Sequence, residues 1–261
     1  MNIYLFILCG LSLKSSLGHD SSVLAPWQVS IQSPSGRHLC SGAIISKNFI
    51  VTTAQCVKYG DVHKYRLVLG SNDLKKKHHD TVYHIEYILM HPHHDKPKKA
   101  NDIALIHTTK NIKFTKRIKF IECKVNFLAE NTKVMISTFG WSESKSSESQ
   151  LKMQTINMKI MSHHDCFSAY SKNVRNPIDI GHLCLTVANN TDYCNHESGA
   201  PLVYKNKLVG LTSFGPGCNK GIPYVASSIS FFFDFIRTKT IGCSRCLIHK
   251  GFTSFFFEFP V

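Results

Sequence analysis

The stretch Cys194-Asn195-His196-Glu197-Ser198-Gly199-Ala200-Pro201-Leu202-Val203 places a serine in a tight turn of small residues, between a cysteine and an apolar run. A loop of this kind can present a nucleophilic hydroxyl, with backbone N–H groups facing the carbonyl that reacts. A Ser-Gly turn before a strand is also common where the serine has no chemical role. The rest of the chain has to decide between these interpretations.

The chain on either side has the pattern of an all-β protein. Short apolar or alternating runs recur, and clusters of Gly, Asn, Asp and Ser separate them. We expect strands at 27–31, 43–45, 49–51, 65–69, 81–85, 103–106, 132–137, 151–160, 201–203 and 208–214. One amphipathic helix is expected at 230–237, because Phe and Ile recur on one side of it. Regular short strands without long helices favour a barrel or a sandwich.

The N-terminus and the cysteines indicate secretion. Residues 3–11 form an apolar run that is too short to span a bilayer, and Ser16-Leu17-Gly18 supplies small residues for cleavage, so residues 1–18 are a predicted signal peptide. An ordinary buried strand is the alternative. Of ten cysteines, nine would remain after removal of Cys9, which implies disulfides and at least one odd thiol.

Composition bears on partners rather than on fold. The formal charge of +14 predicts attraction to polyanions such as sulfated glycans, although lysines that only keep surface loops solvated are the plainer interpretation. A zinc site is not expected, because Cys243-x-x-Cys246 lacks a second pair of ligands at suitable spacing. No other cofactor or metal and no transmembrane segment is expected.

Six short motifs occur along the chain in an order that indicates one protein family. They are Pro26-Trp27-Gln28-Val29-Ser30, Cys40-Ser41-Gly42-Ala43-Ile44-Ile45, Val51-Thr52-Thr53-Ala54-Gln55-Cys56, Asn101-Asp102-Ile103-Ala104-Leu105, the decapeptide at 194–203, and Thr212-Ser213-Phe214-Gly215. Together they resemble the landmarks of the chymotrypsin-like (trypsin-family, S1) serine proteases over residues 26–237. The resemblance implies a domain at 19–240 with two packed six-stranded antiparallel β-barrels, about 26–112 and 125–229, and a C-terminal helix at 230–240. The tail at 241–261 lies outside it.

The resemblance also implies a disulfide framework. The expected pairs are Cys40–Cys56, Cys166–Cys184 and Cys194–Cys218. A further family disulfide is lost at both ends, with Val134 and Tyr204 in its place. Cys123 is left to pair with Cys243, with Cys246 or with another chain.

The catalytic triad implied by the resemblance is degenerate. Ser198 matches the nucleophile and Asp102 the carboxylate, but Gln55 stands where the family has its histidine base. An amide does not titrate near neutral pH and cannot accept the serine proton. A substitute such as His91, His93, His94 or His196 would have to bridge Ser198 and Asp102 through the position that Gln55 fills.

Other parts of the catalytic apparatus also depart from the family. His196 replaces the glycine that forms the oxyanion hole together with Ser198, and a side chain there disfavours the N–H orientation required. Glu197 replaces the aspartate that pairs with the new N-terminus after activation. The activation motif itself has no counterpart, since the aligned residues are Lys14-Ser15-Ser16-Leu17-Gly18.

The predicted substrate pocket is mixed. Asp192 matches the residue that confers preference for Lys and Arg, and Ser213 and Gly215 match the strand that pairs with substrate. Tyr224 replaces a glycine at the pocket base and would fill it. Asn189 begins an N-glycosylation sequon.

Taken together, the residues favour a secreted, catalytically inactive homologue that binds a peptide, a protein or a polyanion. The alternative is a weak or unusual endopeptidase that uses Ser198 with a trypsin-like preference for Lys and Arg. A product without function is a further possibility.

Overall fold

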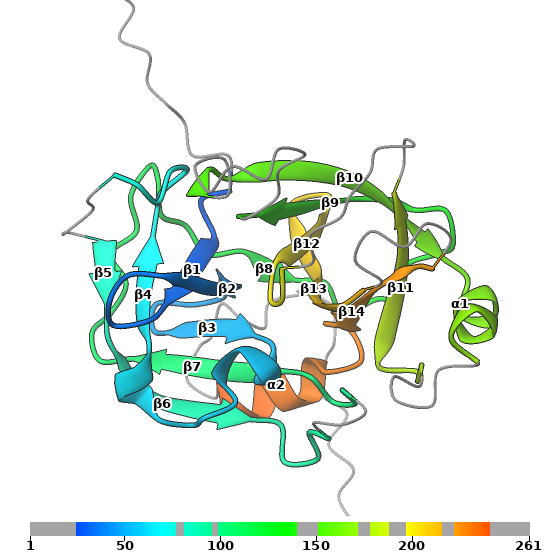
Figure 1. Cartoon of the computed structure of the whole chain (residues 1–261), viewed down its shortest axis with the longest axis horizontal. Coiled ribbons are helices and arrows are strands. Elements are labelled where there is room, and N and C mark those ends of the chain that lie inside the picture. The colour runs from blue at the N-terminus through cyan, green and yellow to red at the C-terminus, as the bar shows by residue number, and fades with distance from the viewer. Residues whose placement is uncertain are drawn as a thin grey trace, which may run out of the picture.

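The structure is a computed structural model of the chain and describes residues 25–76, 81–95, 99–139, 151–171, 178–187, 197–215 and 222–240. Short strands dominate these residues and form two sheets, which lie side by side in Figure 1. The all-β architecture with two barrels is therefore confirmed. The predicted signal peptide and the C-terminal tail lie outside the described residues.

The first sheet runs in the order β5-β4-β1-β2-β3-β7-β6. Its strands are β1 (Gln28–Gln32), β2 (His38–Ile44), β3 (Phe49–Thr52), β4 (Arg66–Leu69), β5 (Val82–Tyr83), β6 (Ile85–Met90) and β7 (Ala104–Thr108). Only His84 separates the two edge strands β5 and β6, so the sheet curls back on itself as a barrel. Two short 3₁₀ helices, η1 (Ala54–Val57) and η2 (Val62–Lys64), connect β3 to β4.

The second sheet closes completely. Its strands are β8 (Glu122–Cys123), β9 (Lys133–Thr138), β10 (Gln154–Met161), β11 (His182–Val187), β12 (Pro201–Tyr204), β13 (Lys207–Phe214) and β14 (Tyr224–Ser228). The order is β12-β9-β10-β11-β14-β13-β8, and pairing of β12 with β13 completes a ring of six strands with β8 outside it.

One helix was not expected from the sequence. It is α1 (His163–Tyr170), which begins after Ser162, whose hydroxyl accepts the Asp165 N–H at 3.0 Å. The Cys166–Cys184 disulfide ties it to β11, and Cys40–Cys56 ties β2 to η1. Two of the expected pairs are thus confirmed, while Cys194 and Cys218 lie outside the described residues.

The missing family disulfide is replaced by apolar packing. In the β9–β12 pair, Leu202 faces Ile136 and Val203 faces Met135. Val134 is buried in the core of the second barrel and Tyr204 packs against the same core. The two residues at the disulfide positions therefore both contribute to the apolar core of the second barrel.

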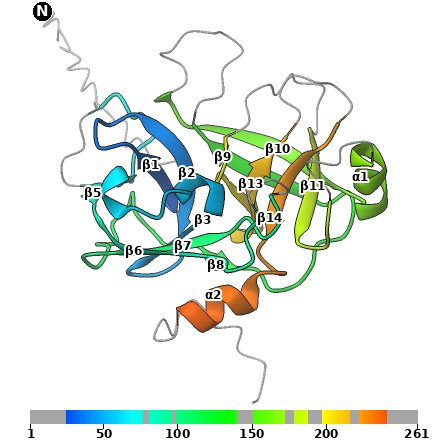
Figure 2. The ribbon, with the colours of Figure 1, turned by 60° about the horizontal axis from the view of Figure 1, so that its bottom comes forward.

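A shared apolar cluster holds the barrels and the C-terminal helix together. Helix α2 (Phe233–Lys239) lies below both barrels in Figure 2. Phe232 and Ile236 are buried among residues of β2, β3 and β7 from one barrel and β12 and β13 from the other. Full burial of each such side chain is worth roughly 1.5–3 kcal/mol. No described helix has the length and apolar character needed to cross a membrane.

The barrels also meet at the turn that carries Ser198. Gly199 has φ +79°, and a Cβ added there would lie 2.1 Å from the Ser41 carbonyl oxygen and 2.7 Å from Thr52 Oγ1. Only glycine permits this approach. The Ser41 N–H in turn donates to the Ser198 carbonyl at 3.0 Å, which fixes Ser198 against the first barrel.

Candidate active site

Gln55 lies between Asp102 and Ser198, at the position where a base would bridge them. It belongs to η1, which the Cys40–Cys56 disulfide anchors to β2. Its Nε2 is 2.9 Å from Asp102 Oδ2, 2.8 Å from Ser198 Oγ and 2.5 Å from the Ser213 carbonyl oxygen. The three predicted residues are therefore brought together, with the amide of Gln55 in the bridging position.

The neighbours of this amide determine which of its ends faces the site. The Ser213 carbonyl can only accept a hydrogen bond, and so can an ionised Asp102 carboxylate. The nitrogen of Gln55 must therefore face both of them, and this nitrogen has no lone pair free for a proton. The two N–H bonds of this amide cannot serve all three acceptors within reach, and the bridging group cannot take a proton from Ser198.

Ser198 has an alternative partner for its hydroxyl. Thr53 Oγ1 is 2.8 Å from Ser198 Oγ and is itself buried at the end of β3. Since Gln55 only donates, the Ser198 proton can be directed to Thr53. This arrangement satisfies the serine as an ordinary hydroxyl and does not activate it as a nucleophile.

Asp102 is fully buried and its carboxylate is held by neutral donors. The Gln55 backbone N–H donates to Oδ1 at 2.9 Å, and Ser213 Oγ donates to Oδ2 at 2.5 Å. Burial raises the pKa of Asp102, although these hydrogen bonds and the nearby His94 and Lys99 oppose the shift. The carboxylate thus keeps its place without a cationic histidine bridging to Ser198.

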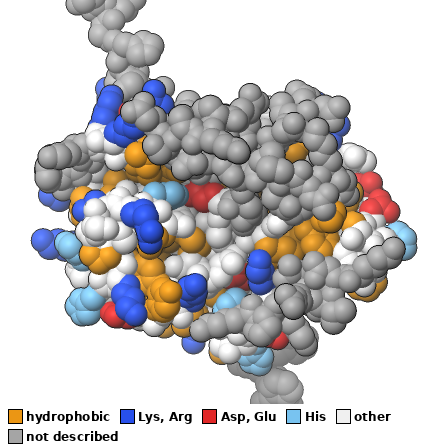
Figure 3. Space-filling view, in the orientation of Figure 1, with side chains coloured by type: hydrophobic (Ala, Val, Ile, Leu, Met, Phe, Trp, Pro, Cys, Tyr) orange, Lys and Arg blue, Asp and Glu red, His pale blue; other side chains and the backbone are white. Residues whose placement is uncertain are grey.

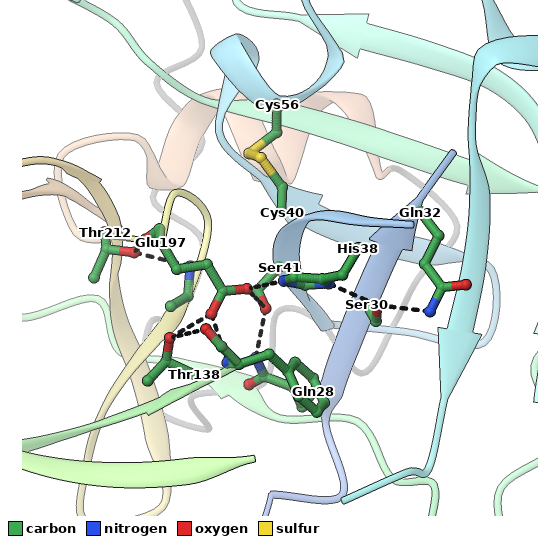
Figure 4. Close-up of polar contacts among 12 residues, drawn as sticks. Gln28, Ser30, Gln32, His38, Cys40, Ser41, Cys56, Thr138, Glu197 and Thr212 are labelled. Carbon is green, nitrogen blue, oxygen red and sulfur yellow. Dashed lines mark hydrogen bonds and ion pairs between the residues drawn. A yellow bond between two sulfur atoms is a disulfide. The ribbon is translucent and has the colours of Figure 1, made fainter. Parts of the chain in front are cut away.

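Glu197, directly before the serine, is surrounded by donors from both barrels (Figure 4). His38 Nε2 lies 2.7 Å from Oε1, and the Ser41 hydroxyl donates to the same oxygen. The Thr138 hydroxyl and the Phe139 N–H, the latter at 2.6 Å, donate to Oε2. Both carboxylate oxygens are thus occupied by groups within the two barrels.

Comparison with known proteins decides the family. The model of the trypsin family matches residues 18–236. Trypsin alpha of Drosophila melanogaster is 32% identical over 196 residues, which cover 74% of this chain and 73% of the relative. The chain belongs to the trypsin family.

Two further relatives agree with this assignment. Hypodermin-A of Hypoderma lineatum is 30% identical over 198 residues, covering 74% of this chain and 73% of the relative. The solved structure of neuropsin, a serine protease expressed in the limbic system of mouse brain, matches with a TM-score of 0.71 and 24% identity, covering 83% of this chain and 95% of its own. The second likeness supports the fold alone. Members of the trypsin family are serine endopeptidases, but membership does not decide whether this chain is active.

The contacts of Glu197 were not expected from the trypsin-family pattern. His38, Ser41 and Thr138 were not singled out in the sequence, yet each contacts the carboxylate. The sequence gives only a weak indication of these contacts, because the three residues are polar and lie in otherwise apolar strands. Ser30 continues the network, with its Oγ 2.8 Å from His38 Nδ1.

The predicted substrate pocket is described in part. The Ser213 hydroxyl donates a hydrogen bond to Asp102. Gly215 is the first residue after β13. Tyr224 is buried in β14 and packs in the core of the second barrel, opposite Leu185. Asp192, His196 and Asn189 lie outside the described residues, so the pocket base, the oxyanion position and the sequon stay predictions.

None of the described histidines near the site lies between Asp102 and Ser198. His94 Nδ1 is 4.0 Å from Asp102 Oδ1 and 3.1 Å from the Ala100 carbonyl. His91 packs against Phe232 and Phe235 beside α2. Within the described residues no group of three or more His, Cys, Asp and Glu side chains is arranged to hold a metal ion.

Proposed function

We propose that the protein is a secreted trypsin-family homologue that does not cleave peptides and acts by binding a peptide, a protein or a polyanion. The observation that carries this proposal is the amide of Gln55, whose nitrogen contacts Asp102, Ser198 and Ser213 at once. Loss of the histidine in a serine protease costs about 10⁶ in turnover. Here the substitute also occupies the space that a base would need.

Other features support the same proposal. Both oxygens of Glu197 are occupied by internal donors, so an inserted N-terminus would have to displace them. The buried Tyr224 stands where the family has a pocket glycine, and we propose that it narrows the base of that pocket. Two disulfides and the predicted signal peptide favour an oxidising, extracellular location.

Hydrolysis of Arg and Lys ester substrates by the purified protein tests the proposal. The expected result is no turnover above that of Ser198→Ala, with Ser35→Ala as a control at an exposed serine. Turnover that Ser198→Ala abolishes and Ser35→Ala retains would overturn the proposal. It would establish the alternative, an endopeptidase that uses Ser198 without a histidine base.

Two additional measurements separate the causes of inactivity. Gln55→His should restore little hydrolysis, because Glu197 keeps its internal partners and His196 still occupies the glycine position. Substantial restoration would mean that Gln55 alone disables the site. A fluorophosphonate probe should leave Ser198 unlabelled, since a serine without a base reacts slowly.

A further inference from the structure

A hollow of about 470 Å³ lies on the first barrel, away from Ser198. It is formed where η2, β4, the β5–β6 corner and the end of β7 meet. Val62, Val82 and Ile85 are among its apolar lining residues, and His63, Arg66 and His84 are among its polar ones. None of the side chains that line the hollow carries a carboxylate.

Arg66 is fixed at this hollow by a neutral partner. Its Nε and Nη2 donate to Gln32 Oε1 at 3.1 and 2.9 Å. Gln32 is buried, and its Nε2 donates to Ser30 Oγ at 3.1 Å, which turns its carbonyl oxygen toward the guanidinium. The amide orients Arg66 without neutralising it, and three of the five N–H donors remain for a ligand.

The loop beside Arg66 is shaped to leave it room. Gly36 has φ +94°, and a Cβ added there would come within 2.5 Å of Arg66 Nη2. A larger residue would push against the guanidinium and would also be strained at this φ. The position of Arg66 is therefore set by packing on one side and by Gln32 on the other, as in a preorganised anion site.

Arg66 is the one permanently charged side chain among the residues that line the hollow. Lys64 and Lys110 follow directly on the lining residues His63 and Thr109. The two nearest acidic residues in sequence do not line the hollow: Asp61 accepts the His63 N–H at 3.0 Å, and Glu86 lies 2.7 Å from His107. In Figure 3, Lys, Arg and His side chains lie beside apolar surface at the left, together with an acidic side chain.

We propose that this hollow binds a sulfated sugar unit of a sulfated glycan, with Arg66 on the sulfate ester and the apolar lining residues against the sugar ring. Arg is suited to bidentate recognition of such anionic oxygens. A concave site with apolar lining residues fits a protruding sugar better than the convex phosphate backbone of a duplex. The proposal rests on the polyanion-binding part of the proposed function and is independent of Gln55 and Ser198.

Titration of the full chain with a heparin-derived hexasaccharide tests the proposal. Arg66→Gln should weaken binding by about tenfold or more, because it removes charge-assisted hydrogen bonds. Lys133→Gln, which removes the same charge from an exposed position on β9, should weaken it less than about twofold. The fully desulfated hexasaccharide should not bind measurably.

Several outcomes would overturn the proposal. Equal weakening by Arg66→Gln and Lys133→Gln would mean diffuse attraction to net charge, and no binding by the parent would exclude the site. A DNA duplex that binds as tightly, with the same dependence on Arg66, would make the ligand a phosphate polyanion instead. If Arg66→Gln does not fold, the His63→Gln/His84→Gln double variant should show the same selective loss. Ester hydrolysis depends on Ser198, and glycan binding is tested at Arg66. A failure to bind the hexasaccharide therefore leaves the test of inactivity unaffected, and a positive hydrolysis result leaves the binding test unaffected.

Discussion

Two carboxylates flank the serine turn, and the protein satisfies them in different ways. Asp102 comes from the loop before β7 and accepts neutral donors, namely the backbone and side-chain amides of Gln55 and the hydroxyl of Ser213. Glu197 comes from the turn before β12 and accepts from His38, Ser41, Thr138 and the Phe139 N–H. Asp102 is hydrogen-bonded by amides and a hydroxyl with His94 4.0 Å away, whereas Glu197 has a histidine ring within hydrogen-bond distance.

This difference shows how the fold accommodates residues that depart from the family's catalytic pattern. In an active member of the family, as the resemblance implies, Asp102 orients a histidine and the residue at Glu197 pairs with a new N-terminus. Here amide and hydroxyl donors replace the first partner, and residues of both barrels replace the second. Buried polar groups are costly only if they lack hydrogen bonds, so the site can stay folded although its residues depart from the family pattern.

The largest expected effect comes from removing the Glu197 carboxylate. Glu197→Ala would remove the shared acceptor of four donors around a side chain that is 8% exposed, so we expect a loss of about 3–5 kcal/mol in the free energy of unfolding. Urea denaturation measures it. Glu197→Gln, which keeps one acceptor oxygen, should lose less, and the exposed Glu130→Ala should stay within about 0.5 kcal/mol of the parent. A loss for Glu197→Ala as small as that for Glu130→Ala would mean that the network is not needed for stability.

A smaller loss of stability is expected from matched Thr→Val changes, one beside Glu197 and one beside Ser198. Thr138→Val removes a donor to the charged Glu197 and should cost about 2 kcal/mol, while Thr53→Val removes a contact with the neutral Ser198 and should cost about 1 kcal/mol. Both threonines are buried, so the same methyl replacement is compared in each case. Equal costs, measured by urea denaturation, would remove the distinction between a charged and a neutral acceptor.

The sequence allowed part of this comparison to be predicted. The order of motifs placed Gln55, Asp102 and Ser198 together, because the family pattern ties each residue to a known point of the barrels. It also led to Cys40–Cys56 and Cys166–Cys184, both of which form. These are features for which a local motif is specific enough to fix a position in space.

The partners of Glu197 could not be predicted in the same way. His38 lies 159 residues from Glu197 along the chain, and the contact depends on the packing of one barrel on the other. Hydrophobic periodicity gives strands but not the register between distant ones. Helix α1 was missed for a local reason, since it is short and has only two buried residues, Cys166 and Tyr170.

The smallest expected effect concerns a histidine on the Asp102 side of the site. His182 is 2% exposed at its side chain, its Nδ1 accepts the Asp179 N–H at 3.1 Å, and its Nε2 is 3.4 Å from the Lys99 carbonyl. Burial lowers the pKa of His182, although Asp179 opposes the shift. The folded state therefore favours neutral His182, and the stability this gives is present above the ordinary histidine pKa of 6.5 and is lost as the pH falls below it.

The Tm of the parent should thus fall more between about pH 7.5 and 5.5 than that of His182→Asn, with the exposed His164→Asn behaving like the parent. The raised pKa of Asp102 acts in the opposite direction in each protein, because its protonation favours the folded state. Equal losses of Tm in the parent and in His182→Asn would mean that His182 takes up its proton as readily in the folded state as in the unfolded one.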